Sequence, residues 1–250
     1  MDSHVKCIQW GKGIVKRLEV YQTLGSTNEF AKCKIKSGGL SGTVLWALTQ
    51  TNGKGRRGRS WDANHNSLTF SLILQCSENV VPQTLTLFVG LGLVQQLETL
   101  VPNVKVKWPN DLWIEDKKLG GILTETIRHK KKLWLIVGVG LNINSVPNRQ
   151  SSPRISLKSA TGCLWSRFGI LDQALVGLEQ GFKLSQGEKT DFSALFRRYG
   201  NFLDRPLTIY YGGQVFTAQA KGVLADGRLL ITNAHGERAL LPDEISVRFD

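Results

Sequence analysis

The sequence predicts an α+β protein, in which a mixed β-sheet with helices is followed by a small β-barrel. Up to residue 204, apolar runs with strand-like alternation are interspersed with stretches of helical periodicity. From Arg205 onward the pattern changes to short strands separated by glycine turns, which suits an SH3-like barrel. We therefore expect two domains, 1–204 and 205–250.

Local signals place the elements. Ser26 and Glu29 have the spacing of a capping box, which predicts a helix over 27–36. Pro82 precedes a helix that extends to about Leu100 and carries its apolar residues on one face. Further helices are expected over 171–185 and 191–200, and strands over 43–50, 67–74, 104–107, 112–114, 119–128, 133–141, 206–211, 215–224, 228–232 and 238–241.

The composition is that of an ordinary globular protein, with 41% hydrophobic and 21% charged residues. No apolar run approaches the roughly 20 residues that span a bilayer, and the first residues lack the apolar core of a signal peptide. The four cysteines are scattered, without the spacing of a metal site or a disulfide framework. We therefore expect a cytoplasmic protein with reduced thiols and no membrane partner.

The segment 53–61, GKGRRGRSW, places four cations and three glycines in nine residues between two strand-like runs. Its like charges repel, and its glycines lose much backbone freedom when they are ordered. Glycines also let a ligand approach the backbone, and guanidinium groups with free N–H groups form anion sites. The segment is therefore predicted to bind an anion; a solvated basic turn or a nucleic-acid patch is the alternative.

The same segment nearly spells a phosphate-binding Walker A loop. That motif requires a helix directly after the loop. Here a polar turn and the alternating run 67–74 follow, which is typical of a strand. We therefore reject the Walker A interpretation.

The formal net charge of +12 makes nucleic acid the default partner to consider. Lys and Arg gather at 54–59, 105–107, 117–118 and 128–132, close to the candidate site segments. The sequence shows no helix-turn-helix.

Four motifs occur in order: GKGRRGRSW at 53–61, KWPNDLW at 107–113, KLGGILTE at 118–125 and GVGLNIN at 138–144. In order and spacing they resemble the GRGRxGRxW, KWPNDL, KxGGIL and GxGxNxN motifs of the biotin protein ligases. A Ser-Thr-Asn triplet at 26–28 also fits. The resemblance covers roughly Tyr21 to the C-terminus. The residues before it are too few for the winged-helix DNA-binding domain that some members of this family carry.

The resemblance implies a biotin/lipoate ligase-like catalytic domain followed by an SH3-like domain, with biotin–[biotin carboxyl carrier protein] ligase activity. In that reaction biotin is activated by ATP as biotinyl-5′-AMP and is then transferred to a lysine. The implied cofactors and substrates are ATP, Mg²⁺ and biotin. The implied partner is the biotin carboxyl carrier protein, the biotin-accepting domain of acetyl-CoA carboxylase. A homodimer is compatible with the resemblance, whereas a nucleic-acid partner is not expected.

Carried over position by position, the motifs imply three overlapping sets of residues. The implied catalytic residues are Lys118, Arg56 and Arg57. The implied biotin-binding residues are Ser26, Thr27, Asn28, Gln50, Gly53, Lys54, Gly55, Arg56, Trp61, Lys118, Gly120 and Gly121. The implied ATP-binding residues are Arg56, Arg57, Lys107, Asn110, Asp111, Lys118, Asn142 and Arg248. No residue is assigned to a metal, because phosphate oxygens would supply most ligands of Mg²⁺.

One departure from the motif concerns Lys54, which stands where the family usually has arginine. Lysine keeps the charge but loses the two-point fork that grips a carboxylate or phosphate. Three other functions remain open on the sequence alone: a lipoate–protein ligase, a basic nucleic-acid-binding regulator, and a ligand-binding module without catalytic activity. The KWPNDL and KLGGIL motifs favour biotin over lipoate.

Overall fold

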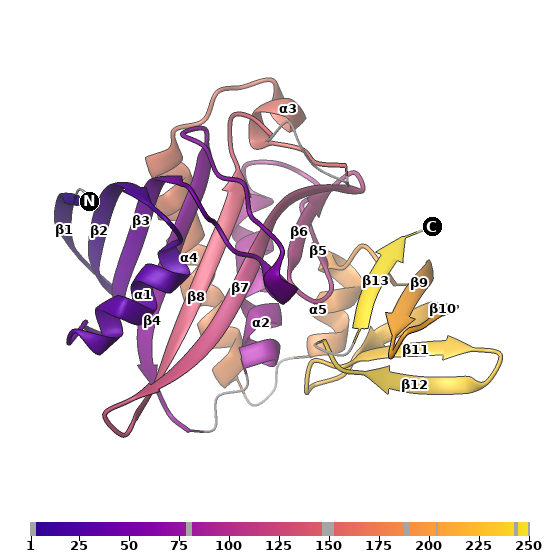
Figure 1. Cartoon of the computed structure of the whole chain (residues 1–250). Helices are drawn as coiled ribbons and strands as arrows, with labels where there is room; N and C mark the ends of the chain where they lie inside the picture. Colours follow the sequence, from indigo (N-terminus) through magenta and orange to yellow (C-terminus); the bar gives the residue numbers. More distant parts are fainter. Residues whose placement is uncertain are drawn as a thin grey trace.

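The computed structural model of the chain describes residues 4–78, 82–146, 153–187, 191–203, 205–242 and 245–249. Its largest element is an eight-stranded sheet with helices on both faces (Figure 1). Strands β2 and β3 are parallel, and the other neighbours are antiparallel. In sheet order the strands are β1 (His4–Lys12), β2 (Val15–Leu24), β3 (Thr43–Gln50), β4 (Ser67–Cys76), β8 (Lys132–Asn142), β7 (Lys117–His129), β6 (Asp111–Ile114) and β5 (Lys105–Lys107).

The helices divide between the two faces of this sheet. Figure 1 shows α1 (Thr27–Lys36) against one face, with α2 (Pro82–Leu97) and α4 (Arg167–Gln186) behind the other. The short α3 (Leu157–Thr161) and α5 (Phe192–Tyr199) flank α4 in the chain. The α1 face carries a compact apolar cluster of Tyr21, Leu24, Ala31, Ile35, Leu45, Ala47, Ile73, Trp134 and Ile136. The larger core lies on the opposite face.

Helix α2 buries apolar residues on opposite sides, whereas the sequence pattern predicted a single apolar face. Val89 and Leu93 are as fully buried as Leu91, because α4 covers the side of α2 that the sheet leaves open. The two helices meet through glycine: a Cβ at Gly92 would lie 2.2 Å from the carbonyl oxygen of Gly177. Among the described residues, no helix combines the length and apolar character needed to cross a membrane.

The last strands form a separate antiparallel sheet, which confirms the predicted fold class. Hydrogen bonds between the turn after β10 and the rest of the chain include one from Trp108 Nε1 to the Gly227 carbonyl (3.0 Å) and one from Thr84 Oγ1 to the Asp226 carbonyl (2.8 Å). Whether residues 205–250 are an independent domain stays a prediction. In sheet order these strands are β12 (Gly236–Leu240), β11 (Leu229–Asn233), β10 (Gln214–Val223), β9 (Pro206–Tyr211) and β13 (Ile245–Phe249).

Strands β1 and β2 were not predicted from the sequence. Residues of β2 do not alternate simply between buried and exposed, because both faces of the sheet are covered along this strand. Val20 packs in the core of the α2 face, and its neighbour Tyr21 packs in the cluster beneath α1. The two-residue period that identifies a half-exposed strand is therefore absent.

The capping box predicted at the start of α1 does not form. Ser26 is the N-cap residue, but its side chain accepts no capping hydrogen bond. The backbone N–H of Thr27 donates instead to Gln50 Oε1, 2.7 Å away at the end of β3. The carboxylate of Glu29 pairs with Lys32, so it does not reach back to the helix start. A long-range contact has replaced the local one.

The glycine contact between α2 and α4 makes a prediction about stability. Gly92→Ala should lower the free energy of unfolding by about 1–3 kcal/mol, because the added methyl group meets the backbone of α4. Gly222→Ala, where a Cβ would have no neighbour within 4 Å, is the matched control and should change it by less than about 0.5 kcal/mol. Urea unfolding measures both, and equal effects would contradict the proposed contact.

Candidate functional site

The segment 53–61, here called the glycine loop, is folded back on itself between β3 and β4. The Trp61 N–H donates to the Gly53 carbonyl (2.8 Å), and the Gly55 N–H donates to the Arg59 carbonyl (2.8 Å). Between these contacts lies the single helical turn η1 (Arg56–Gly58), in which Arg57 has φ 57°, in the left-handed region. These backbone hydrogen bonds close the loop and direct its cations to one side.

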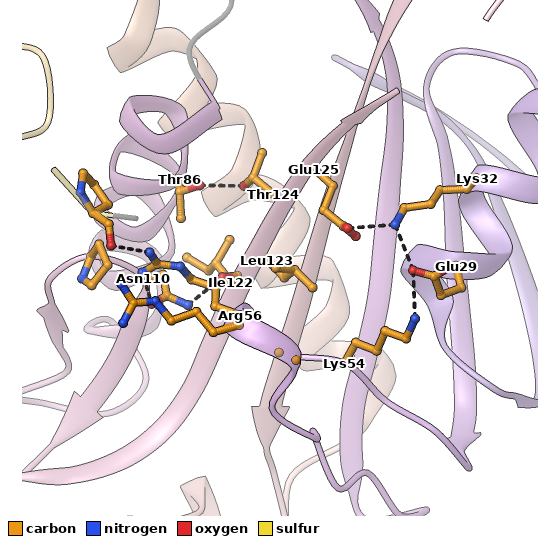
Figure 2. A pocket seen from close by; sticks show the side chains of 15 residues that line it. Glu29, Lys32, Lys54, Arg56, Thr86, Asn110, Ile122, Leu123, Thr124 and Glu125 are labelled. Carbon is orange, nitrogen blue, oxygen red and sulfur yellow. Dashed lines mark hydrogen bonds and ion pairs between the residues drawn. The ribbon is translucent and has the colours of Figure 1, made fainter. Parts of the chain in front are cut away.

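That side borders a cavity of about 570 Å³, here called the loop cavity (Figure 2). Its wall is formed by residues from the glycine loop, α1, α2, β7, the turn before β6 and the C-terminal unit, which is the part of the chain from residue 205 onward. Both acidic and basic side chains line it. The lining residues are Glu29, Lys32, Lys54, Gly55, Arg56, Arg57, Gly58, Thr86, Pro109, Asn110, Ile122, Leu123, Thr124, Glu125 and Pro242.

Arg56 connects three parts of the chain across this cavity. Its Nη1 donates to Asn110 Oδ1 (3.2 Å), and its Nη2 donates to the Pro242 carbonyl (2.6 Å). Asn110 is held in turn by a hydrogen bond from its Nδ2 to the Ile122 carbonyl (2.9 Å). The guanidinium of Arg56 therefore lies at the junction of the glycine loop, the main sheet and the C-terminal unit.

Lys118 lies in a second group, here called the Lys118 cluster, which consists of Lys118, Asp111, Trp61 and Arg154. Lys118 Nζ donates to Asp111 Oδ1 at 2.6 Å, and both side chains are about four-fifths buried. The Trp61 ring lies 5.9 Å from Lys118 Nζ and 5.3 Å from Arg154 Cζ. Two cations thus converge on one ring, and Lys118 is paired there with the Asp111 carboxylate.

Backbone pairing brings Arg154 to this cluster. The Lys118 N–H donates to the Pro153 carbonyl, and the Ile155 N–H donates to the Lys118 carbonyl, each at 3.0 Å. Burial lowers the pKa of Arg154, and the nearby Asp62 and Asp111 carboxylates oppose that effect. Arg154 belongs to none of the four sequence motifs, so its place in this cluster was not predicted.

Glycines shape the sheet surface beneath these side chains. A Cβ at Gly140 would lie 2.5 Å from the Trp61 ring, and a Cβ at Gly138 would lie 2.2 Å from Asn28 Oδ1. Both glycines belong to β8 and face the same side of the sheet. Their lack of side chains therefore lets the glycine loop and the start of α1 lie directly on the strand.

The two glycines predicted to contact biotin in β7 have different surroundings. A Cβ at Gly121 would lie 3.3 Å from Asp111 Oδ1 and 3.5 Å from Lys118 Nζ, so this glycine faces the Lys118 cluster. A Cβ at Gly120 would instead lie 2.5 Å from the Gly140 carbonyl oxygen. Close packing against β8 is thus a sufficient reason for glycine at that position.

The triplet 26–28 forms a buried polar group at the start of α1. Asn28 Nδ2 donates to the Leu123 carbonyl (3.1 Å) and to Glu125 Oε2 (2.8 Å). Asn28 Oδ1 accepts a hydrogen bond from Ser71 Oγ (2.6 Å). The hydrogen bonds of Asn28 therefore hold α1 on the sheet. Its contact with biotin stays a prediction.

Lys107 is partly buried near the Lys118 cluster. Its Nζ lies 4.1 Å from the centre of the Trp113 ring. Burial lowers the pKa of Lys107 from 10.5 to about 8, and the positive charge of Lys118 acts in the same direction, while Asp111 opposes it. A charged lysine held this way is costly for the fold, which points to a function for the charge.

Of two further predicted ATP-binding residues, Asn142 and Arg248, the structure describes the side chain of Asn142 alone. Asn142 is fully buried, and its Nδ2 donates to the Ile155 carbonyl (3.1 Å). Its Oδ1 is buried with no hydrogen-bond partner in the described part of the chain. Arg248 belongs to β13, but its side chain lies outside the described residues.

Many of the predicted residues thus gather in three neighbouring places. Gln50 and Gly53 line a smaller cavity of about 220 Å³ at the base of the glycine loop, together with Trp61. The loop cavity brings together Lys54, Gly55, Arg56, Arg57 and Asn110, and the Lys118 cluster brings together Trp61, Asp111 and Lys118.

Comparison with known proteins gives a consistent result. Residues 20–142 match the model of the biotin/lipoate A/B protein ligase family. The chain is 28% identical over 228 residues to a biotin–[acetyl-CoA-carboxylase] ligase of Mycobacterium tuberculosis, covering 86% of this chain and 83% of the relative.

Two solved structures from Aquifex aeolicus are similar along nearly the whole chain. One is a biotin protein ligase in complex with biotin and ATP, with a TM-score of 0.81 and 29% identity over 93% of this chain and 99% of the other. The second is a mutant biotin protein ligase in complex with biotin, with a TM-score of 0.78 and 30% identity over 93% and 98%.

The buried charge of Lys107 makes a pH-dependent prediction. Because its folded-state pKa of about 8 lies below its usual 10.5, the charged lysine destabilises the fold below pH 8, by an amount on the order of 3 kcal/mol. That cost disappears as the pH rises from about 8 to about 10.5. Lys107→Met should therefore be more stable than the wild type at neutral pH, with a difference that shrinks toward pH 10.

Urea unfolding at about pH 7 and about pH 10 measures this difference. Lys117→Met, which removes an exposed lysine, is the control and should show no such trend. A Lys107→Met protein that is less stable than the wild type at neutral pH would contradict the assignment of a costly buried charge.

Proposed function

The chain belongs to the biotin/lipoate A/B protein ligase family, and we propose that it is an ATP-dependent biotin–protein ligase. The observation that carries this proposal is the Lys118 cluster. A lysine and an arginine converge there on the Trp61 ring of the glycine loop, and the lysine is paired with the Asp111 carboxylate. The likeness to a biotin protein ligase in complex with biotin and ATP supports the same reaction.

The reaction explains why the site needs fixed positive charge. In the first step, a carboxylate oxygen of biotin attacks the α-phosphorus of ATP, and the bond from that phosphorus to the pyrophosphate oxygen breaks. In the second step, a carrier lysine amine attacks the carbonyl carbon of biotinyl-5′-AMP, an amide forms, and AMP leaves while the amine loses a proton. Both partners of the first step are anions, so cations must offset their repulsion.

Lys118 has the properties needed at the reacting centre. Its ammonium group is a point charge on a flexible stem, so it can follow the carboxylate and the phosphate through the displacement. Asp111 holds it at 2.6 Å without a bound anion. An incoming anion would share or replace that carboxylate as a partner of Lys118. We propose that Arg154, whose guanidinium faces the same ring, adds a second fixed cation.

Arg56 and Arg57 are proposed to bind phosphate from the glycine loop. Arg56 already donates to two neutral acceptors, Asn110 and the Pro242 carbonyl. A phosphate oxygen is a stronger acceptor than either, because the hydrogen bond is then assisted by opposite charges. Binding of a nucleotide would therefore exchange these contacts for charge-assisted ones. We propose that Lys107 contributes a further cation and that Arg248 contacts ATP.

The biotin end is assigned to the sheet surface between α1 and the glycine loop. Trp61 supplies an apolar wall there. Gln50 can both donate and accept, which suits the ureido ring of biotin. The remaining proposed biotin contacts are Ser26, Thr27, Asn28, Gly53, Lys54, Gly55, Gly120 and Gly121.

The site also offers oxygen atoms for the Mg²⁺ that accompanies ATP. Asn142 Oδ1 is a buried carbonyl oxygen with no hydrogen-bond partner among the described residues, and Asp111 supplies a carboxylate. Oxygen donors of these kinds fit Mg²⁺, whose other ligands are phosphate oxygens and water. The bound ion would neutralise phosphate charge.

We propose the biotin-accepting domain of acetyl-CoA carboxylase as the protein substrate, in line with the name of the Mycobacterium tuberculosis relative. The surplus of positive charge suits an acidic carrier. All four cysteines are free, which supports a cytoplasmic location. A homodimer remains a proposal.

One experiment tests the function directly. The protein is incubated with biotin, Mg·ATP and a carrier domain, and the carrier is then analysed by mass spectrometry. Biotin should appear on one lysine, and a carrier with that lysine changed to arginine should remain unmodified. Replacing biotin by lipoate should give no product. Modification by lipoate alone would contradict the proposal in favour of the other branch of the family.

A single substitution tests the role of Lys118. Lys118→Ala should slow the formation of biotinyl-5′-AMP about 10²–10³-fold, because it removes the cation at the reacting centre. Lys117→Ala is the matched control, since that side chain is exposed and adjacent in sequence. Pyrophosphate release measures the first step for both variants. Rates for Lys118→Ala within a few-fold of the control would remove Lys118 from the mechanism.

A further inference from the structure

A chain of ion pairs runs along the wall of the loop cavity, as Figure 2 shows. Lys54 Nζ lies 3.3 Å from Glu29 Oε1, and Lys32 Nζ lies 2.8 Å from the same oxygen. Lys32 Nζ also contacts Glu125 Oε1 at 2.8 Å. The other oxygen of Glu125 accepts the hydrogen bond from Asn28. The glycine loop is thereby connected through α1 to strand β7.

Lys32 is the centre of this chain. Burial by itself would lower the pKa of Lys32, but its hydrogen bonds to Glu125 and Glu29 outweigh that effect and raise the pKa. The hydrogen bond from Lys32, assisted by Lys54, lowers the pKa of Glu29. These groups therefore hold opposite charges at neutral pH and attract one another.

Lys54, at one end of this series of ion pairs, lacks the fixed geometry of an arginine side chain. An ammonium group on a four-carbon stem has no fixed direction, whereas the guanidinium of arginine is planar and presents a rigid fork. Lys54 is 47% exposed, so packing does not fix its side chain either. A carboxylate partner on a neighbouring helix supplies the missing constraint. The ammonium group has three donors, so it can keep this partner and still bind a second anion.

Resting on the proposed function, we infer that Glu29 is a positioning residue for the reaction: its carboxylate holds Lys54 and the glycine loop in place for the biotin carboxylate, and Lys32 anchors Glu29. The capping box that Glu29 was expected to complete does not form. Its contacts in the wall of the cavity are all with lysines.

The kinetic test uses Glu29→Gln, which keeps size and helix propensity but removes the charge. The KM for biotin should rise about three- to fivefold, as expected for one partly exposed ion pair, while kcat and the KM for ATP stay unchanged. In a Lys54→Met background the same change should have no further effect, because its target is gone. Glu78→Gln, which breaks the exposed pair with Arg128, is the matched control.

Two outcomes of the kinetics would overturn the inference. One is a fall in the KM for biotin in Glu29→Gln, which would make Glu29 a competitor of the substrate. The other is an unchanged effect of Glu29→Gln in the Lys54→Met background, which would show that Glu29 acts through another group. Circular dichroism spectra and thermal unfolding of each variant confirm that the fold is retained.

A second measurement does not depend on the reaction. Trypsin cleaves after lysine and arginine, and the glycine loop contains four such sites. In the absence of ligands, Glu29→Gln should be cut within residues 53–61 a few-fold faster than the wild type and Glu78→Gln. Equal cleavage rates would overturn the inference even in an active ligase. Faster cleavage in a protein that does not biotinylate would refute the proposed function alone.

Discussion

The site depends on Coulomb repulsion among the cations that the glycine loop and β7 bring together. Each described contact offsets part of this repulsion. Lys118 is paired with Asp111, and Lys54 is paired with Glu29. Arg56 donates to two neutral acceptors, Asn110 and the Pro242 carbonyl. These contacts offset only part of the positive charge, so an anion that enters the site is attracted by several groups at once. Such a site favours the crowded negative charge of a carboxylate meeting a triphosphate.

This electrostatic arrangement rests on a sheet with two unlike faces. One face of β8 carries Val137, Val139 and Leu141 into the large core against α2 and α4. The other face carries Gly138 and Gly140, against which Asn28 and Trp61 lie. The apolar face stabilises the strand, and the glycine face lets the glycine loop and the start of α1 lie directly on the backbone. The same strand therefore provides both stability and the floor of the site.

The sequence predicted the elements that have strong local signals. Helix α1 and strand β3 occupy the predicted residues, and the strand after the glycine loop excludes the Walker A interpretation as expected. Strand β2 was missed because burial on both faces erased its alternation. The capping box was wrong because Gln50, distant in sequence, takes the backbone donor at the helix start. In each miss, a contact between remote segments overrode the local pattern.

The same limit applies to the site. The motifs identified Lys118, Asp111 and Trp61 as site residues, and these lie in one cluster. Arg154 joins this cluster because its segment pairs with the backbone of Lys118. No local spacing encodes that pairing. Likewise, Lys54 could be recognised as a departure from the family pattern, but Glu29 as its partner depends on how α1 packs beside the loop.

The central claim is that fixed cations in this site hold the anionic centre of biotinyl-5′-AMP. Calorimetric titration of the ligand-free protein with biotinyl-5′-AMP and with the uncharged methyl ester of biotin, from about 0.05 to about 0.5 M salt, tests it most directly. The account predicts that the affinity for the adenylate falls steeply with salt, while the weaker binding of the ester hardly changes. The same salt dependence for both ligands would contradict it.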